Sequence, residues 1–107
     1  MIVRTWRGRA APAQPDDYPE HFRIRVLPAL KEIRGFHGAS LLRHDRPDEI
    51  EFLVLTRWTS LDAIRAFTGE HLDRAVVEPE GIEALVSFDP TVRHYEVIEE
   101  AAVRRRK

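Results

Sequence analysis

The stretch FLVLTRWTSLDAIRAF, residues 52 to 67, decides the fold because it joins a strand with two apolar faces to an amphipathic helix. Side chains of a strand alternate between its two faces, so Phe52, Val54 and Trp58 point one way. Leu53 and Leu55 point the other way. A strand that is apolar on both faces needs a packing partner on each of them. The sequence must therefore supply cover for the second face, and the tryptophan at the end of the strand needs an explanation.

The composition indicates one folded domain and sets several chemistries aside. The chain has 107 residues, with 17 Lys and Arg against 18 Asp and Glu. A charge this close to neutral argues against nucleic acid or an anionic membrane as a partner. The sequence contains no cysteine, which excludes disulfides, thiolate metal sites and a cysteine nucleophile. The 43% of hydrophobic residues is typical of a folded domain with a core.

The N-terminus, MIVRTWRGRA, reaches an arginine at position 4 and lacks the apolar run of a signal peptide. No segment approaches the roughly 20 apolar residues that a membrane-spanning helix needs. We therefore expect a cytoplasmic protein.

The first half of the chain contains a strand and a long helix. Residues 2–9 alternate with β-branched and aromatic side chains, which predicts a strand. A helix is predicted from about Asp17 to Gly35, with Pro28 bending it because proline lacks the N–H and crowds the preceding turn. The apolar stripe of this helix comprises Phe22, Val26, Leu30 and Ile33.

The rest of the chain contains three strands, one helix and several short helical turns. Residues 37–44 and a strand ending at Trp58 are joined by a polar turn, which favours an antiparallel hairpin. Thr59 or Ser60 is expected to cap a helix that ends at Gly69. Short helical turns are predicted over residues 70–86, with one starting at Pro79, followed by a strand over residues 91–98.

The element order is β-α-β-β-α-β, which predicts an α+β, ferredoxin-like fold with an antiparallel sheet. Such a sheet carries both helices on one face and leaves the other face open. We expect a homodimer formed through the sheet faces, because an exposed apolar face exceeds what soluble monomers tolerate. Alternatively, residues 70–86 or the N-terminal arm cover that face.

Several segments resemble antibiotic biosynthesis monooxygenase domains: a strand ending in Trp58, the helix SLDAIRAF, Gly69, then HLDRAVVEPE and a closing HYEV. The resemblance implies one domain over residues 1–100, a dimeric α/β barrel, and a basic C-terminal tail at 101–107. Members of this family include enzymes that oxygenate anthrone- or quinol-like aromatics without flavin, metal or haem. Others degrade haem, and the same frame carries isomerases and decarboxylases, so the activity must be argued from the site.

The haem-degrading branch has a signature that this sequence lacks. The signature consists of an asparagine on the first strand, a tryptophan within the second helix and an axial histidine on the next helix. The chain contains no asparagine, Phe67 stands near the tryptophan position and Val77 near the histidine position. The missing signature therefore argues against haem degradation by that mechanism.

His94 and Trp58 are the candidate catalytic residues. An imidazole titrates near neutral pH, so His94 could deprotonate a phenol or hold the resulting anion. Trp58 could stack on an aromatic substrate and donate one hydrogen bond. The alternatives are a hydrogen-bonded interface histidine and a core tryptophan.

The candidate substrate-binding residues combine aromatic side chains with one arginine and one histidine. An arginine on a strand must be paired or bind an acidic group, with Glu51 and Glu96 as available partners. Core packing or a solvated loop explains the others equally well. These candidates are Arg4, Trp6, Tyr18, Phe22, Phe67 and His71.

The function that we expect is oxygenation of a small phenolic or quinol-type aromatic without a cofactor. The histidines at 21, 37, 44, 71 and 94 match no metal-binding spacing, so no metal is expected. Two alternatives remain: a non-enzymatic dimer that binds a small hydrophobic molecule, and an isomerase or lyase that uses His94 for proton transfer.

Overall fold

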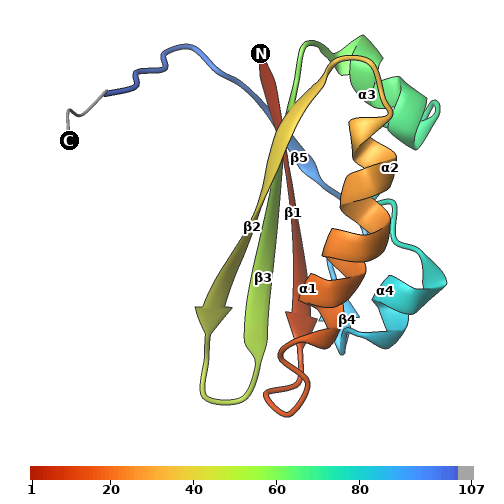
Figure 1. The fold of residues 1–107 in the computed structure, drawn as a ribbon, viewed down its shortest axis with the longest axis vertical. Helices are drawn as coiled ribbons and strands as arrows, with labels where there is room; N and C mark the ends of the chain where they lie inside the picture. Colours follow the sequence, from red (N-terminus) through yellow and green to blue (C-terminus); the bar gives the residue numbers. More distant parts are fainter. Residues whose placement is uncertain (104–107) are drawn as a thin grey trace.

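The structure, a computed structural model, describes residues 1–103, so the end of the predicted basic tail lies outside the described residues (Figure 1). The sheet carries its helices on one side, and no described helix is long and apolar enough to span a membrane. The elements are β1 (Ile2–Ala10), α1 (Asp17–His21), the π-helical turn η1 (Phe22–Val26), α2 (Leu27–Lys31), β2 (Phe36–Asp45), β3 (Ile50–Trp58), α3 (Leu61–Thr68), α4 (Pro79–Glu83), β4 (Ser87–Phe88) and β5 (Arg93–Glu96).

The sheet has the order β2-β3-β1-β4, and β5 pairs with the other half of the same edge of β1. Every pairing is antiparallel, with Ile2 opposite Trp58 between β1 and β3. β3 therefore lies between β1 and β2, which run in the same direction. The predicted antiparallel α+β fold of ferredoxin-like order is confirmed.

The first helix contains a π-helical turn that the sequence reading did not predict. The Leu27 N–H donates to the carbonyl of Phe22, five residues back instead of four. Pro28 follows directly, and the wider turn relieves the crowding that its ring causes in a regular α-helix. The buried residues Tyr18, Phe22 and Leu30 are spaced in multiples of four, and the wider turn keeps them on one face.

The second half of the chain differs from the prediction at its strands. Ser60 caps α3, its Oγ accepting from the Ala63 N–H at 3.2 Å, and Gly69 ends the helix at φ +73°. The last strand is shorter than predicted, because Thr91 bridges to Arg74 instead of β1. The two-residue strand β4 was missed, since two residues carry no detectable periodicity.

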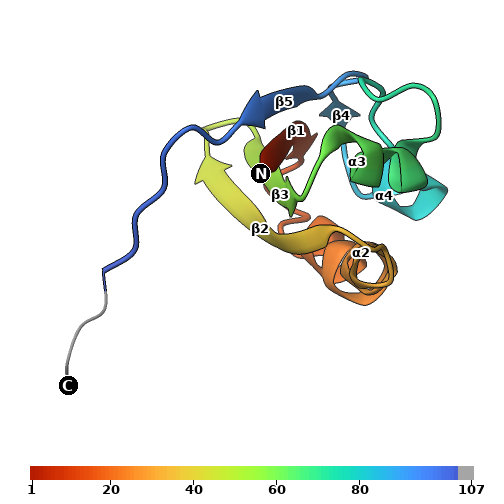
Figure 2. The ribbon, with the colours of Figure 1, turned by 90° about the horizontal axis from the view of Figure 1, so that it is seen from above.

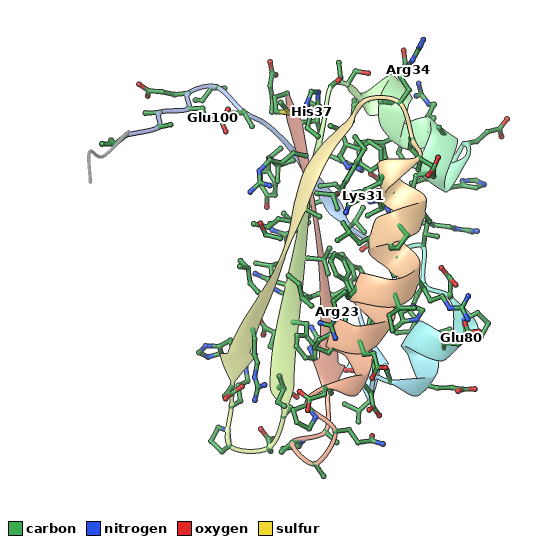
Figure 3. All side chains as sticks on the ribbon, viewed as in Figure 1. Arg23, Lys31, Arg34, His37, Glu80 and Glu100 are labelled. Carbon is green, nitrogen blue, oxygen red and sulfur yellow. The ribbon has the colours of Figure 1, made fainter. Side chains whose placement is uncertain are left out.

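The two faces of the sheet differ in cover. Along β3 every second residue is buried, from Ile50 to Trp58, and these residues face the helices. Side chains fill the space between the sheet and the helices (Figure 3). We call this side the covered face. The opposite side, the open face, carries no helix among the described residues (Figure 2). Its apolar side chains are Val3, Leu42, Leu53, Leu55 and Tyr95.

The alternative prediction that residues 70–86 cover the open face is wrong. α4, within this segment, packs against α1 and so lies on the covered face. The segment after β5 runs away from the helices in Figure 2. The open face of β3 is left half-buried at Leu53 and Leu55.

Candidate functional site

A small cavity lies between the covered face and the helices. Its volume is about 40 Å³, which is room for one or two water molecules. Side chains from the strands, the first helix, α3 and the segments around them line it: Arg4, Trp6, Tyr18, Val26, Leu30, Val54, Thr56, Phe67, Val76 and Val92. The lining is apolar and aromatic except for Arg4, Thr56 and the Tyr18 hydroxyl.

Arg4 places a cation inside this apolar cavity. The residue is 5% exposed and its guanidinium lies 5.7 Å from the centre of the Phe67 ring. Nη1 donates to the carbonyl of Leu72 at 2.6 Å, and Nη2 donates to the carbonyl of Arg74 at 2.7 Å. Arg4 thus ties the segment between α3 and α4 to the sheet.

Arg4 has no carboxylate in salt-bridge contact among the described residues. Glu51, a partner considered from the sequence, instead pairs with Arg7 at 3.4 Å and Arg46 at 3.2 Å. Burial lowers the pKa of Arg4 to about 10, and the charge of Asp73 opposes this effect. A guanidinium has five N–H donors, and its contacts here occupy three of them. Arg4 therefore retains both charge and donors for an anionic ligand.

His94 reaches the cavity only through Arg4. Its Nε2 lies 3.0 Å from Arg4 Nη1, and because a guanidinium only donates, Nε2 must be the unprotonated acceptor. Nδ1 then carries the proton and faces Asp73 Oδ1 at 3.6 Å. Burial and the charge of Arg4 lower the pKa of His94, against the opposing effect of Asp73. His94 is absent from the cavity lining, and the nitrogen that would act as a base is already engaged.

Tyr18 and Trp6 form one wall of the cavity. Their ring centres are 5.7 Å apart. The Trp6 N–H donates to the carbonyl of Asp89 at 2.8 Å, which fixes the indole. Burial raises the pKa of Tyr18, so its hydroxyl remains a neutral donor over the physiological range.

Trp58 lies behind the cavity wall. It is fully buried, its N–H donates to Thr56 Oγ1 at 2.8 Å, and its ring stacks on Phe67 with centres 6.1 Å apart. Trp58 does not line the cavity, whereas Phe67 and Thr56 do. The indole is thus placed to support these two residues and has no donor left for a ligand.

The two remaining candidates, Phe22 and His71, do not line the cavity. Phe22 is buried in the core cluster with Phe52 and does not line the cavity. His71 is exposed, on the surface loop after α3. Sequence reasoning missed the backbone carbonyls of Leu72 and Arg74, which bind Arg4. No pattern of side chains can reveal a backbone contact of this kind. Thr56 shares a face with the named Trp58, so strand alternation could have identified it.

A second hollow of about 40 Å³ adjoins the cavity and shares Tyr18, Val26, Phe67 and Val76 with it. Val77, at the position that resembles the axial histidine of the haem-degrading branch, lines this hollow. A valine cannot ligate iron, so the residues do not fit a haem held in that way. Among the described residues, no group of three or more carboxylates and histidines is placed to hold a metal ion.

The fold has close counterparts among solved structures. An antibiotic biosynthesis monooxygenase-like protein of Bacillus cereus is 18% identical, with a TM-score of 0.69 over 95% of this chain and 97% of that chain. SnoaB of Streptomyces nogalater, a cofactor-independent oxygenase, is 16% identical, with a TM-score of 0.62 over 92% and 95%. MhuD of Mycobacterium tuberculosis, a haem degrader with two haems bound, is 23% identical, with a TM-score of 0.63 over 95% and 100%.

These likenesses establish the fold, because identities this low do not carry an activity from one protein to another. No curated protein matches the sequence. The model of the antibiotic biosynthesis monooxygenase family matches residues 1–78, which span β1 to the segment before α4. The covered sheet, the cavity beneath its helices and this match lead to one conclusion: the chain belongs to the antibiotic biosynthesis monooxygenase family.

Proposed function

We propose that the protein oxygenates a small phenolic or quinol-type aromatic without a bound cofactor. The observation that carries the proposal is Arg4, a buried guanidinium without a carboxylate partner within residues 1–103, at an aromatic-walled cavity. A buried cation without a counterion favours an anionic ligand, and a phenolate is the anion that an aromatic wall also accepts. The proposal joins these two preferences in one substrate.

The chemistry uses the substrate as its own reductant. Ionisation of the phenol gives an electron-rich anion that passes an electron to O₂. The two radicals then combine at a ring carbon that carries hydrogen. Loss of water from the resulting hydroperoxide leaves a quinone carbonyl. The proton of the phenol is taken up by the peroxide, so one oxygen atom of O₂ enters the product and the other leaves as water with two hydrogens, one from the hydroxyl group and one from the ring carbon.

Four of the residues that line the cavity have a role in this proposal. Arg4 contacts the substrate oxyanion, and the neutral Tyr18 hydroxyl is a second donor to it. Trp6 and Phe67 hold the ring plane. His94 acts through Arg4, and Trp58 supports Phe67 from behind.

An aromatic substrate needs more room than the present cavity offers. Phe67 and Val76 are two of the four side chains that line both the cavity and the adjoining hollow. We propose that these two side chains move when the substrate enters. The site then extends toward Val77 and the first turn of the first helix.

We also propose that the protein is a homodimer that buries the open face. Four strands contribute apolar side chains to this face, and a second copy offers the same apolar surface by symmetry. The family membership is consistent with this arrangement.

The test is oxygen uptake by metal-stripped protein with hydroquinones, naphthols and anthrones. Uptake above the uncatalysed rate is expected for the unmodified protein, with a loss of at least about tenfold in Arg4→Gln. Arg23→Gln is the matched control, because Arg23 is an exposed arginine of the first helix that lines neither the cavity nor the open face. Unchanged uptake in Arg4→Gln, with folding intact, contradicts the role of Arg4.

The alternatives give different results in the same preparation. Binding without turnover indicates a small-molecule-binding dimer, and turnover without oxygen consumption indicates a proton-transfer enzyme. Haem titration is the third arm, because MhuD shares the fold. His21 lines the hollow beside Val77 and is the side chain to replace if haem binds.

A further inference from the structure

The contact between His94 and Arg4 links the protonation state of His94 to anion binding in the cavity. Arg4 Nη1 is held between the carbonyl of Leu72 and His94 Nε2. The carbonyl is a fixed acceptor, whereas Nε2 accepts only while the imidazole is neutral. A protonated His94 becomes a donor at Nε2 and faces a second cation at 3.0 Å.

Asp73 selects the tautomer in which Nε2 is free to accept. Its carboxylate lies 3.6 Å from Nδ1, on the side of the ring away from Arg4. Asp73 and the two carbonyls that Arg4 binds belong to the same segment, between Leu72 and Arg74. The Asp73 carboxylate thus orients the imidazole, and the two carbonyls orient the guanidinium.

We propose that His94 is a positioning residue that holds Arg4 in its anion-binding orientation through an unprotonated Nε2, with Asp73 fixing the tautomer. The inference rests on the proposed function and specifies the protonation state of His94 in which the cavity binds an anion. The cavity accepts an aromatic anion while His94 is neutral and loses affinity when His94 is charged.

The other groups around His94 support this direction of the effect. Arg4 faces it from β1 and Asp73 faces it from the segment after α3. Its neighbours Arg93 and Tyr95 point to the open face, and Glu96 shares its face two residues along β5. His94 is 12% exposed in its side chain, so water screens the contact with Arg4 only weakly. Since burial and Arg4 lower the pKa of His94, the neutral form prevails at neutral pH.

The experiment measures binding of 1-naphthoate by calorimetry between about pH 5 and about pH 8, where its carboxyl group stays ionised. We expect the affinity to fall by about tenfold or more as the pH drops, because a hydrogen bond to a charged group is lost. His94→Gln keeps an acceptor near the Nε2 position and cannot titrate. It is expected to bind at the higher pH within about threefold of the unmodified protein and to lose the pH dependence.

His94→Leu removes the acceptor and is expected to bind weakly at both pH values, while His37→Gln, at an exposed histidine outside the cavity lining, is the matched control. A pH dependence that persists in His94→Gln overturns the proposal, as does an affinity that rises with acidity or no binding at all. Nitrogen NMR of the unmodified protein must show an unprotonated Nε2 at the higher pH, and this measurement needs no variant. Naphthoate binding is read without oxygen consumption, so a failure of the oxygenase assay leaves this result intact.

Discussion

Neighbouring residues of the same strand lie in different surroundings on the covered and the open face of the sheet. Phe52 of β3 is 1% exposed beneath the first helix, whereas its neighbour Leu53 stays half-buried on the open face. The covered face carries the core and also the cavity with Arg4. The open face carries apolar surface that no helix of the described part of the chain covers. One face therefore completes the fold of a single copy, and the other is suited to joining two copies.

The largest expected effect tests this division within one strand. Phe52→Ala should lower the free energy of unfolding by about 3–5 kcal/mol, because it leaves a cavity in a closed core. Leu53→Ala, measured at concentrations where the chain is monomeric, should cost less than about 1.5 kcal/mol. Urea unfolding of both variants measures the difference. Equal losses contradict the distinction between the faces.

The open face can be tested by a charge at its centre. Leu55→Asp should raise the dimer dissociation constant by about 100-fold or more, since an unpaired charge is costly to bury. Sedimentation across a concentration series measures this change. Leu61→Asp on α3, where the leucine is 42% exposed, is the control and should leave the dimer intact. A monomeric unmodified protein refutes the proposed dimer.

The folding stability should depend on pH because of a buried tyrosine on the covered face. Burial raises the pKa of Tyr18 above its ordinary value, so the folded state keeps a proton that the unfolded state releases above about pH 10. Stability from this residue is present below that pH and should fall by about 1.4 kcal/mol per pH unit above it. Alkaline unfolding of the unmodified protein and of Tyr18→Phe measures the effect. The variant should show a smaller alkaline loss, and identical slopes exclude the buried phenol as its cause.

The smallest expected effect concerns a helix that covers the sheet. Ser60→Ala should cost about 1 kcal/mol, because the Ala63 N–H at the start of α3 loses its acceptor. Ser60→Asp keeps an acceptor at the same position and should retain most of the stability. Thermal unfolding compares the two variants. A similar loss in both variants would point to packing around Ser60 instead of capping.

Much of the fold could be predicted from periodicity, because burial imposes a regular pattern on strands and helices. The alternation of residues 50–58 and the apolar stripe of the first helix gave the element order and the two-faced sheet. β4 and the π-helical turn could not be predicted in this way. Both depend on local hydrogen bonds that leave no repeating pattern of side chains.

The candidate site was predicted less completely. Arg4, Trp6, Tyr18 and Phe67 line the cavity as expected for substrate-binding residues, although their binding role stays a prediction. Trp58 and His94 were named for their chemistry, yet both lie one layer behind the cavity. The sequence shows which chemical groups exist, but backbone carbonyls and long-range packing decide which of them reach a ligand.

The π-helical turn links the length of the first helix to a single proline. A π-helical turn holds one residue more than an α-helical turn, so deleting a residue within Phe22–Val26 would leave the flanking α-helices aligned. The same deletion within an α-helical part would rotate the residues beyond it by about 100°. A regular α-helix, however, would press the ring of Pro28 against the carbonyl four residues earlier. Among sequences with this fold, a first helix shortened by one residue is therefore expected to lack the proline, so insertion, deletion and proline content should vary together.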